Sequence, residues 1–376
     1  MKTLLVTRIA LRDFRNIAGL SIEPAARFNV IAGDNGQGKT SLLEALYAVA
    51  TSRSFRTERL KELQRDGSEF ARVDAELSED GLTRSQRLTV SGGGRAVFLD
   101  GERAERLADY AVRTPMVVFH PGDLDLTMGG ATRRRDLLDR VGLFTDPAAA
   151  DHRRRYRLAL RERQKVLEVR GEHASELAAY ERIVAEHGAR LGQIRLNAAA
   201  ALEREAEPGW RRLVASDLGF GMRYQPGGVL DEDRFRAELE TRRATDRRRR
   251  AATFGPHKDD LELVVDGRPA RKHASQGQHR ILTLTLKLAE LAAIREARGT
   301  HPILLLDDVS SELDPTRIGA VYEFLNASPS QVFVTTTRPE LFQTPGVGPS
   351  DRRDYRLQAG ALQGGPRAPG EALDSP

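Results

Sequence analysis

One eight-residue stretch, GDNGQGKT at residues 33–40, constrains the fold of this chain more than any other part of the sequence. It follows the apolar run at residues 28–31 and precedes residues 41–49, whose apolar side chains recur at helical spacing. Strand, glycine-rich loop and helix in this order are the context of a P-loop. The glycines let successive backbone N–H groups point into one concavity, and the helix that begins at Lys39 adds the positive end of its dipole. We therefore expect the stretch to bind a nucleoside triphosphate, rather than to be a glycine-rich turn without a ligand.

The residue types within this loop predict separate roles in binding ATP and Mg²⁺. The compact charge of Lys39 can reach the β- and γ-phosphates, which also makes Lys39 a candidate catalytic residue. The hydroxyl of Thr40 is a type of ligand that Mg²⁺ accepts. The predicted nucleotide-binding residues in this part of the chain are Gly33, Asp34, Asn35, Gly36, Gln37, Gly38, Lys39, Thr40 and Ser41.

A second acidic motif lies near the other end of the chain, where the apolar run at residues 303–306 is followed by Asp307 and Asp308. A buried strand that ends in two acids places carboxylates at the carboxyl edge of a parallel sheet, where open α/β folds bind ligands. Asp307 is the predicted Mg²⁺ ligand together with Thr40, and Asp308 is the predicted group that orients or deprotonates the attacking water. The predicted catalytic residues are therefore Lys39, Asp307 and Asp308. On its own, the same pattern also fits a strand that ends in a solvated acidic turn.

The wide separation of these two motifs predicts an ATPase domain that is interrupted by another domain. The N-terminal part contains short segments of alternating polarity broken by glycines, which are typical of antiparallel hairpins. Between residues 130 and 250 the strand signals fade and Leu, Ala, Arg and Glu recur at helical spacing, with breaks expected at residues 208–209 and 219–228. We expect an α/β fold: an ABC-type P-loop ATPase head with a mixed sheet and an antiparallel β patch, and an inserted α-helical domain.

The predicted domain boundaries follow these changes in composition. Residues 1–128 and 253–343 would form the two parts of the ATPase domain, residues 129–252 the inserted helical domain, and residues 344–376 a mostly disordered tail with an edge strand at 354–363.

The composition of this 376-residue chain limits the classes of function. A formal net charge of +5 and a pI near 9.6 favour a polyanionic partner, although genomic base composition also explains the bias towards arginine. The absence of cysteine excludes disulfides, thiolate metal sites and cysteine nucleophiles. No stretch of the sequence has the length and apolarity of a signal-peptide core or a membrane span, so we expect a cytoplasmic protein with no membrane partner.

A further motif, SQGQ at residues 275–278, directly precedes an apolar helix expected at residues 279–298. A serine at a helix N-cap beside a glycine makes a small anion-binding site that suits a γ-phosphate, but an ordinary capped helix has the same pattern. The position of this motif ahead of residues 303–308 resembles the signature motif of ABC-type ATPases, and residues 311–314 resemble their D-loop. In those proteins the signature of one subunit closes on ATP held by another. The resemblance implies two ATP molecules sandwiched in a head-to-tail dimer, with a nucleotide site that includes Ser275, Gln276, Gly277 and Gln278.

Five motifs in order extend the resemblance over about residues 4–340. They are LRDFRNI (11–17), GDNGQGKT (33–40), FHPGDL (119–124), TFGPHKDDL (253–261) and SQGQ (275–278). Together they resemble the RecF family of bacterial recombination-mediator ATPases, which are related to SMC heads. The resemblance implies a weak, DNA-stimulated ATPase that acts as a switch: ATP binding would join two copies on duplex, gapped or junction DNA, and slow hydrolysis would release them. It also implies gap repair with RecR and RecO, and help in loading RecA.

Three positions depart from the pattern of ABC-type ATPases. Asp308 stands where many of them have glutamate, and a shorter carboxylate fits slow turnover. Residues 335–337 are all threonine where a histidine is common, which leaves open which of Thr335, Thr336 and Thr337 senses the γ-phosphate. No glutamine close to His120 marks the loop that contacts the metal or the water in that family.

Arginine clusters supply the candidate DNA contacts, because phosphate binding by such groups is independent of sequence and sensitive to salt. The predicted DNA-binding residues are Arg133, Arg134, Arg135, Arg153, Arg154 and Arg155, and residues 247–250 form a third cluster. Solvated helix faces with compensating acids are the alternative for each cluster. The sequence shows no interleaved aromatic residues and no helix-turn-helix or zinc-finger signature, so we expect contact with the DNA backbone.

Two other classes of function remain open. An ABC transporter ATPase subunit would share the nucleotide motifs, but the long helical insertion and the hairpin-rich N-terminal part argue against it. An SMC-like structural DNA tether needs long coiled coils, and sustained heptads are missing from the sequence. The sequence favours an ATP-switched DNA-binding protein.

Overall fold

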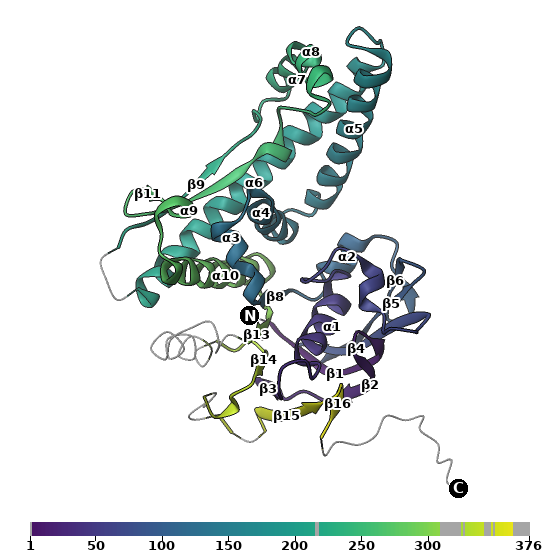
Figure 1. The fold of residues 1–376 in the computed structure, drawn as a ribbon, viewed down its shortest axis with the longest axis vertical. Coiled ribbons are helices and arrows are strands. Elements are labelled where there is room, and N and C mark those ends of the chain that lie inside the picture. Colours follow the sequence, from purple (N-terminus) through teal and green to yellow (C-terminus); the bar gives the residue numbers. More distant parts are fainter. Residues whose placement is uncertain are drawn as a thin grey trace. The chain divides into compact units, whose positions relative to one another are not determined.

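The computed structural model describes residues 2–214, 218–308, 325, 328–341, 347–348 and 350–363. The protein consists of two compact units (Figure 1). The first unit combines Met1–Asp123 with Arg298–Pro376, and the second unit is Leu124–Ala297. The first unit is therefore built from both ends of the chain and the second from its middle.

A six-stranded sheet in the first unit carries both nucleotide motifs. Its order is β16-β15-β3-β14-β13-β8, and all neighbouring pairs are parallel except β16 with β15. The strands are β3 (Phe28–Ala32), β8 (Met116–Phe119), β13 (Ile303–Asp307), β14 (Val332–Thr336), β15 (Arg352–Gln358) and β16 (Ala361–Leu362). Every residue of β8, β13 and β14 is buried, as expected for continuous apolar runs in parallel strands. The segment predicted as one edge strand at 354–363 instead forms two strands: β15 pairs with β3 on one side and with β16 on the other, so of these two only β16 lies at an edge of the sheet.

A second sheet in the first unit is largely antiparallel. It contains β1 (Lys2–Phe14), β2 (Ile17–Ile22), β4 (Phe70–Glu79), β5 (Leu82–Ser91), β6 (Gly94–Leu99) and β7 (Glu102–Arg103), with β12 (Thr300–His301) parallel to β1. Buried residues alternate with more exposed ones along β4 and β5, because one face packs on the core and the other faces water. This sheet is the antiparallel patch that the sequence predicts.

Helix α1 (Lys39–Thr51) connects the two sheets into one core. It begins at Lys39, as the P-loop pattern predicts, and nearly all of its residues are buried. The helix contacts β4 and β5 of one sheet and β13 and β14 of the other. Leu42 and Leu46 of α1 belong to the same apolar cluster as Val73 of β4 and Phe333 of β14. The short elements of this part are η1 (Leu60–Leu63), α2 (Leu107–Ala111), η2 (Pro121–Leu124) and η4 (Pro339–Leu341).

The second unit is mainly helical and contains one small sheet. Its helices are α3 (Asp125–Met128), α4 (Ala131–Thr145), α5 (Ala149–Arg170), α6 (Leu177–Leu213), α7 (Glu232–Thr241), α8 (Arg243–Arg249), η3 (Pro256–Lys258), α9 (Ala270–His273) and α10 (Gln276–Arg298). Its strands are β9 (Phe220–Gln225), β10 (Asp260–Val265) and β11 (Arg268–Pro269). Helices α5 and α6 pack along each other as a long hairpin (Figure 1). Among the helices of the described ranges, none combines the length and apolarity needed to cross a membrane.

The helix break predicted at residues 208–209 is wrong, because α6 continues through Pro208 to Leu213. Proline inside a helix removes one backbone donor and costs about 3 kcal/mol. Burial of Ala206 before the proline and of Trp210 and Leu213 after it offsets this cost, and the indole N–H of Trp210 donates to the carbonyl of Leu218 at 2.8 Å. Tertiary packing therefore outweighs the local preference.

The glycine-rich stretch 219–228 contains a strand that the sequence does not reveal. β9 pairs with β10 in antiparallel register along its whole length, from Phe220 opposite Val265 to Gln225 opposite Asp260. Glycine lowers the local preference for a strand, so a distant partner decides the structure. In the structure residues 253–297 belong to the second unit with β9, whereas the predicted boundaries assigned them to the ATPase domain.

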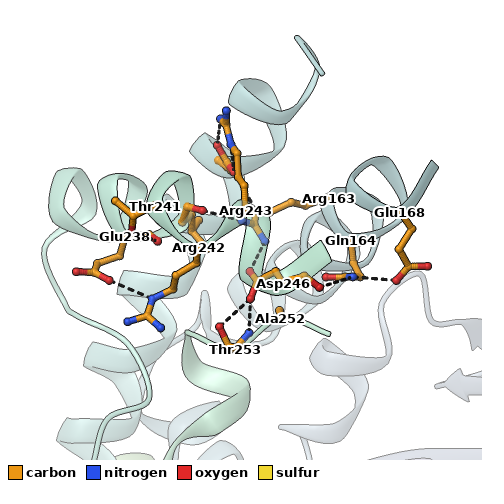
Figure 2. A network of polar contacts seen from close by, with 12 residues as sticks. Arg163, Gln164, Glu168, Glu238, Thr241, Arg242, Arg243, Asp246, Ala252 and Thr253 are labelled. Atoms are coloured by element: carbon orange, nitrogen blue, oxygen red, sulfur yellow. Dashed lines mark hydrogen bonds and ion pairs between the residues drawn. The ribbon is translucent and has the colours of Figure 1, made fainter. Parts of the chain in front are cut away.

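A buried ionic network holds the helices together at one end of the second unit (Figure 2). The fully buried guanidinium of Arg163 on α5 lies 3.0 Å from Glu181 of α6 and 2.8 Å from Asp246 of α8. Asp246 also accepts from the backbone N–H and the hydroxyl of Thr253, at 2.9 and 2.7 Å. Arg243 of α8 pairs with the same Glu181. Three helices are thus tied by the fully buried charges of Arg163, Glu181 and Asp246, with the partly exposed Arg243 beside them.

Replacing Arg163 with alanine is expected to destabilise the protein by about 3–5 kcal/mol, because two buried carboxylates lose a cation. Arg161→Ala on the exposed side of the same helix is the matched control. Urea unfolding should show a much lower midpoint for Arg163→Ala than for Arg161→Ala. Equal midpoints for the two variants would show that the network contributes little.

Candidate functional site

The P-loop adopts a strained backbone that suits phosphate binding. Gly36 and Gly38 have φ angles of 81° and 103°, which disfavour other residues. A Cβ atom at Gly33 would lie 2.5 Å from the carbonyl oxygen of Leu357, so only glycine fits there. The ammonium of Lys39 folds back over the loop and donates to the carbonyls of Gly33 and Asp34, at 2.7 and 2.8 Å. The cation is therefore held against the glycine-rich loop by two backbone carbonyls.

The loop opens onto a hollow of about 790 Å³, which lies within the range of about 300–1,000 Å³ that is common for ligand pockets. It is lined by Arg15, Asn16, Asn35, Gly36, Gly38, Lys39, Thr40, Ser41, Arg56, Glu62, Gln64, Arg65, Asp66, Asp307 and Asp308. Burial lowers the pKa of Lys39, while the charges of Asp308, Asp307 and Asp34 oppose this shift. The hollow thus brings the predicted Lys39, Thr40, Asp307 and Asp308 together, although they lie far apart in the sequence.

Oxygen ligands converge at the carboxyl edge of the parallel sheet. Asp307 accepts hydrogen bonds from the hydroxyls of Thr40, at 2.9 Å, and Thr335, at 2.7 Å. Burial raises the pKa of the Asp307 carboxyl, and the two hydrogen bonds oppose this rise. A hydroxyl and a carboxylate at hydrogen-bond distance are hard donors of the kind that Mg²⁺ prefers. The residues present therefore fit a magnesium ion held by Thr40 and Asp307.

Thr335 is the threonine of the run 335–337 that contacts the acidic motif. Its hydroxyl accepts from the backbone N–H of Asp308 at 3.0 Å and donates to Asp307. The hydroxyl of Thr336 instead accepts from the backbone N–H of Arg338, and Thr337 is exposed. Asp308 itself has a φ of 51°, a left-handed conformation that is uncommon outside glycine, asparagine and aspartate. Thr335 is therefore the strongest candidate for the γ-phosphate sensor.

Two residues near this site were missed by the analysis of the sequence. His120 follows β8, and because Phe119 pairs with Leu306 it lies beside Asp307 at the same sheet edge. Asn16, in the turn after β1, donates to the carbonyl of Gly36 at 3.1 Å and accepts from the hydroxyl of Ser41 at 2.8 Å. The signal for His120 was present, since a polar residue directly follows a buried strand at residues 116–119. No local pattern marks Asn16 as a P-loop contact.

A buried carboxylate orders two arginines that line the hollow. Glu44 of α1 is fully buried and accepts two hydrogen bonds from Arg15, at 2.9 and 2.7 Å. Arg56 lies 3.3 Å from the same carboxylate, and the hydroxyl of Ser54 also donates to it. Arg15 and Arg56 therefore add fixed positive charge to the lining of the hollow.

The signature-like serine forms a reciprocal capping box in the second unit. The hydroxyl of Ser275 accepts from the backbone N–H of Gln278 at 3.2 Å, and the Gln278 side chain accepts from the N–H of Ser275 at 2.7 Å. Gln276 and Gly277 form the first turn of α10. Ser275 thus caps a 23-residue helix, and its role towards a nucleotide stays a prediction.

The predicted D-loop at residues 311–314 lies outside the described residues.

The predicted DNA-binding arginines differ in how accessible they are. The contact predicted for Arg134 is wrong, because its side chain is buried and pairs with Asp260 at 2.7 Å. Arg133 is exposed, whereas Arg135 donates to the carbonyl of Asp259. Arg153 pairs with Asp136 and Asp139, and both Arg154 and Arg155 pair with Asp151. In the described parts of the chain, the exposed residues Arg247, Arg248, Arg249 and Arg250 form no ion pair.

Known proteins resemble this chain over most of its length. A model of the RecF/RecN/SMC N-terminal domain family matches residues 5–346. The DNA replication and repair protein RecF of Anaeromyxobacter sp. (strain Fw109-5) is 39% identical over 363 residues, which cover 94% of this chain and 97% of that protein. The chain belongs to the RecF family. RecF of Myxococcus xanthus (strain DK1622) is 38% identical over 338 residues, which cover 87% of this chain and 89% of that protein.

Solved structures support the same assignment. A structure of the recombination mediator protein RecF with ATP, described as part of the RecFOR pathway, has a TM-score of 0.85 and 27% identity, and the match covers 96% of this chain and 97% of that one. The head domain of Smc from Pyrococcus furiosus has a TM-score of 0.55 at 16% identity, which shows a shared fold. The RecF resemblance and the ATPase-head fold predicted from the sequence are confirmed.

Proposed function

We propose that this RecF-family protein is an ATP-switched DNA-binding protein that acts in recombinational gap repair. The observation that carries the proposal is the convergence of Thr40, Asp307 and Thr335 beside the P-loop and Lys39. One cation and several hard oxygen donors suit a nucleoside triphosphate with Mg²⁺. The similarity to a RecF structure determined with ATP supports ATP as the nucleotide.

Each residue of this site has a role that follows from its contacts. Lys39 binds the β- and γ-phosphate oxygens in place of the loop carbonyls. Thr40 and Asp307 hold Mg²⁺, which neutralises charge on the phosphates when it is bound. Thr335 keeps the Asp307 carboxylate oriented, and Asp308 orients the attacking water as a weak general base. A short carboxylate in this role suits slow, DNA-stimulated hydrolysis, which is what a switch needs.

The nucleotide is proposed to join two copies of the protein head to tail. Ser275, at the positive end of α10, binds the γ-phosphate of the ATP held by the other copy. Hydrolysis removes this contact and releases the dimer from duplex, gapped or junction DNA. RecR and RecO are the proposed partners, with RecA as the protein whose loading is assisted. The name of the RecFOR pathway in the similar structures supports this choice of partners.

A gel-shift assay on duplex DNA at low salt tests the proposed function. ATP is expected to increase the retained DNA, because only the dimer presents two basic surfaces to one duplex. Equal retention with and without ATP would contradict the proposal. Copurification with a membrane permease would instead favour the transporter subunit, and a strongly extended hydrodynamic shape would favour the SMC-like tether.

Ser275→Ala is expected to lose ATP-dependent dimerisation while the monomer still binds ATP, as measured by sedimentation and by nucleotide titration. Loss of the cap alone costs about 1 kcal/mol, so a second variant must separate capping from phosphate binding. Ser275→Asp keeps a good N-cap and places a negative charge against the γ-phosphate. Dimerisation by Ser275→Asp would show that Ser275 only caps the helix.

The exposed cluster at residues 247–250 is expected to contact the DNA backbone, and three of its four arginines are changed in the test. Changing Arg247, Arg248 and Arg249 together to alanine should weaken the salt dependence of binding. The magnitude of the slope of log affinity against log salt should fall by about three, at roughly 0.9 for each phosphate contact. The matched control removes three exposed arginines that are each paired with an acid: Arg204, Arg211 and Arg236. The same slope in the two triple variants would exclude the cluster as a DNA contact.

A further inference from the structure

The turn between β15 and β16 lies against the P-loop. Because β15 runs parallel to β3, its carboxyl end reaches the same sheet edge as the loop that follows β3. The backbone N–H of Ala359 donates to the side-chain oxygen of Gln37 at 2.5 Å, and the N–H of Gly360 donates to the carbonyl oxygen of Gln37 at 3.0 Å. A single P-loop residue therefore receives two hydrogen bonds from a turn more than 300 positions away in the chain.

The backbone of the β15–β16 turn packs closely against the P-loop and Asn16. A Cβ atom built at Gly38 would lie 3.3 Å from the side-chain nitrogen of Asn16 and 3.5 Å from the Cα atom of Gly360. A Cβ atom at Gly360, whose φ is 78°, would lie 2.5 Å from the carbonyl oxygen of Asn16. Glycine at position 360 is thus required both by its conformation and by its neighbour.

Asn16 closes the other side of the loop. It donates to the carbonyl of Gly36 and accepts from the hydroxyl of Ser41. The loop is therefore held at Gly36 from the β1–β2 turn and at Gln37 from the β15–β16 turn. The two turns also contact each other, because Gly360 packs on Asn16.

The contacts of Asn16 and of the β15–β16 turn with the P-loop are called the clamp below. They affect phosphate binding, because a glycine-rich loop loses much conformational entropy when its N–H groups are aligned on a ligand. Contacts that fix the loop beforehand remove this cost from the binding step. Neither Ala359 nor Gly360 lines the hollow, so the turn does not act by touching the nucleotide.

We propose that the β15–β16 turn and Asn16 are positioning elements that hold the P-loop in its phosphate-binding conformation through Gln37 and Gly36. The C-terminal hairpin is thereby a functional part of the ATP site. This inference rests on the proposed ATP site and adds to it a segment that no nucleotide motif contains.

Gly360→Ala tests the clamp, with Gly81→Ala as the matched control. Gly81 has a φ of 82° in the β4–β5 turn of the same unit, and no atom lies within 4 Å of a Cβ placed there. Both variants carry the same backbone strain, but only Gly360→Ala displaces the turn from Asn16. The readouts are the Kd for a fluorescent ATP analogue and amide hydrogen exchange over residues 33–40 without nucleotide.

Gly360→Ala is expected to raise the Kd about tenfold, the effect of losing two ordinary hydrogen bonds, and to speed exchange in the loop. Gly81→Ala should leave both readouts at the wild-type value, even if the two variants lose similar thermal stability. Identical Kd and exchange in the two variants would overturn the inference. If wild-type protein binds no ATP, the proposed function fails, and the exchange comparison still decides whether the clamp exists.

Variants of Gln37 test the same inference if Gly360→Ala does not fold. Gln37→Leu removes the acceptor for the Ala359 N–H, whereas Gln37→Glu keeps an acceptor at that position. Exchange over residues 33–40 should be faster in Gln37→Leu and close to wild type in Gln37→Glu. Wild-type exchange in Gln37→Leu would overturn the inference.

Discussion

Lys39→Ala is expected to weaken ATP binding at least 30-fold and to abolish the ATP-dependent dimer. Lys39 is held over the loop by the carbonyls of Gly33 and Asp34, and in the proposed mechanism its ammonium exchanges these carbonyls for phosphate oxygens. Removing one partner of such a charge pair costs about 2–5 kcal/mol, which corresponds to a factor of roughly 30 to several thousand in affinity. Nucleotide titration measures the first effect and sedimentation the second.

Lys61→Ala is the control for this variant, because it removes the same charge from an exposed position in the same unit. It should bind ATP and dimerise as the wild type does. A Lys39→Ala protein that still sediments as a dimer with ATP would separate dimerisation from the P-loop. The proposed mechanism would then be wrong at its first step.

Asp308→Asn is expected to bind ATP normally, to lower turnover about 10²- to 10⁴-fold and to give a persistent dimer. Asparagine is close in shape to aspartate and tolerates the left-handed conformation found at this position, so the fold should be unchanged. The backbone N–H that donates to Thr335 is also kept. The change therefore removes only the basic oxygen that would act on the attacking water.

Asp109→Asn supplies the matched control, since Asp109 is exposed on α2 of the same unit and does not line the hollow. Its turnover and its rate of dimer decay should equal those of the wild type. Steady-state phosphate release and the lifetime of the ATP-bound dimer are the measurements. Wild-type turnover in Asp308→Asn would remove Asp308 as the general base.

Local patterns in the sequence predicted the parts of the site that each strand or loop carries by itself. The P-loop at residues 33–40 and the strand that ends at Asp307 combine side-chain chemistry with a short structural context, and both lie where the sequence placed them. Parallel strands bring their carboxyl ends to one edge, so the meeting of Thr40 with Asp307 also follows from the pattern.

The sequence does not predict contacts between segments that are far apart in the chain. The hydrogen bonds from residues 359–360 to Gln37 depend on β15 lying beside β3, and no local signal specifies that neighbour. The sequence predicts an apolar helix at α10, but this helix also buries the charged side chains of Lys287 and Glu290 beside Arg140. Burial alone would raise the pKa of Glu290, but these two cations outweigh it and lower the pKa to about 2. Such pairs depend on tertiary packing, which a single sequence does not display.

The sequence also does not reveal which arginines are exposed. Six arginines in two runs were equivalent candidates for DNA contact, but Arg134 is buried against Asp260. The cluster at residues 247–250 is exposed, whereas the neighbouring Asp246 is buried against Arg163 (Figure 2). Burial, which only the structure gives, decides which charges are available to a polyanion.

Sedimentation velocity of the wild type with and without ATP, on gapped DNA and in its absence, measures whether ATP joins two copies of this protein through a nucleotide site to which both contribute. The wild type is expected to be a monomer without nucleotide and a dimer with ATP. Lys39→Ala and Ser275→Ala are expected to form no dimer under the same conditions. The same sedimentation coefficient for the wild type with and without ATP would show that ATP does not join two copies.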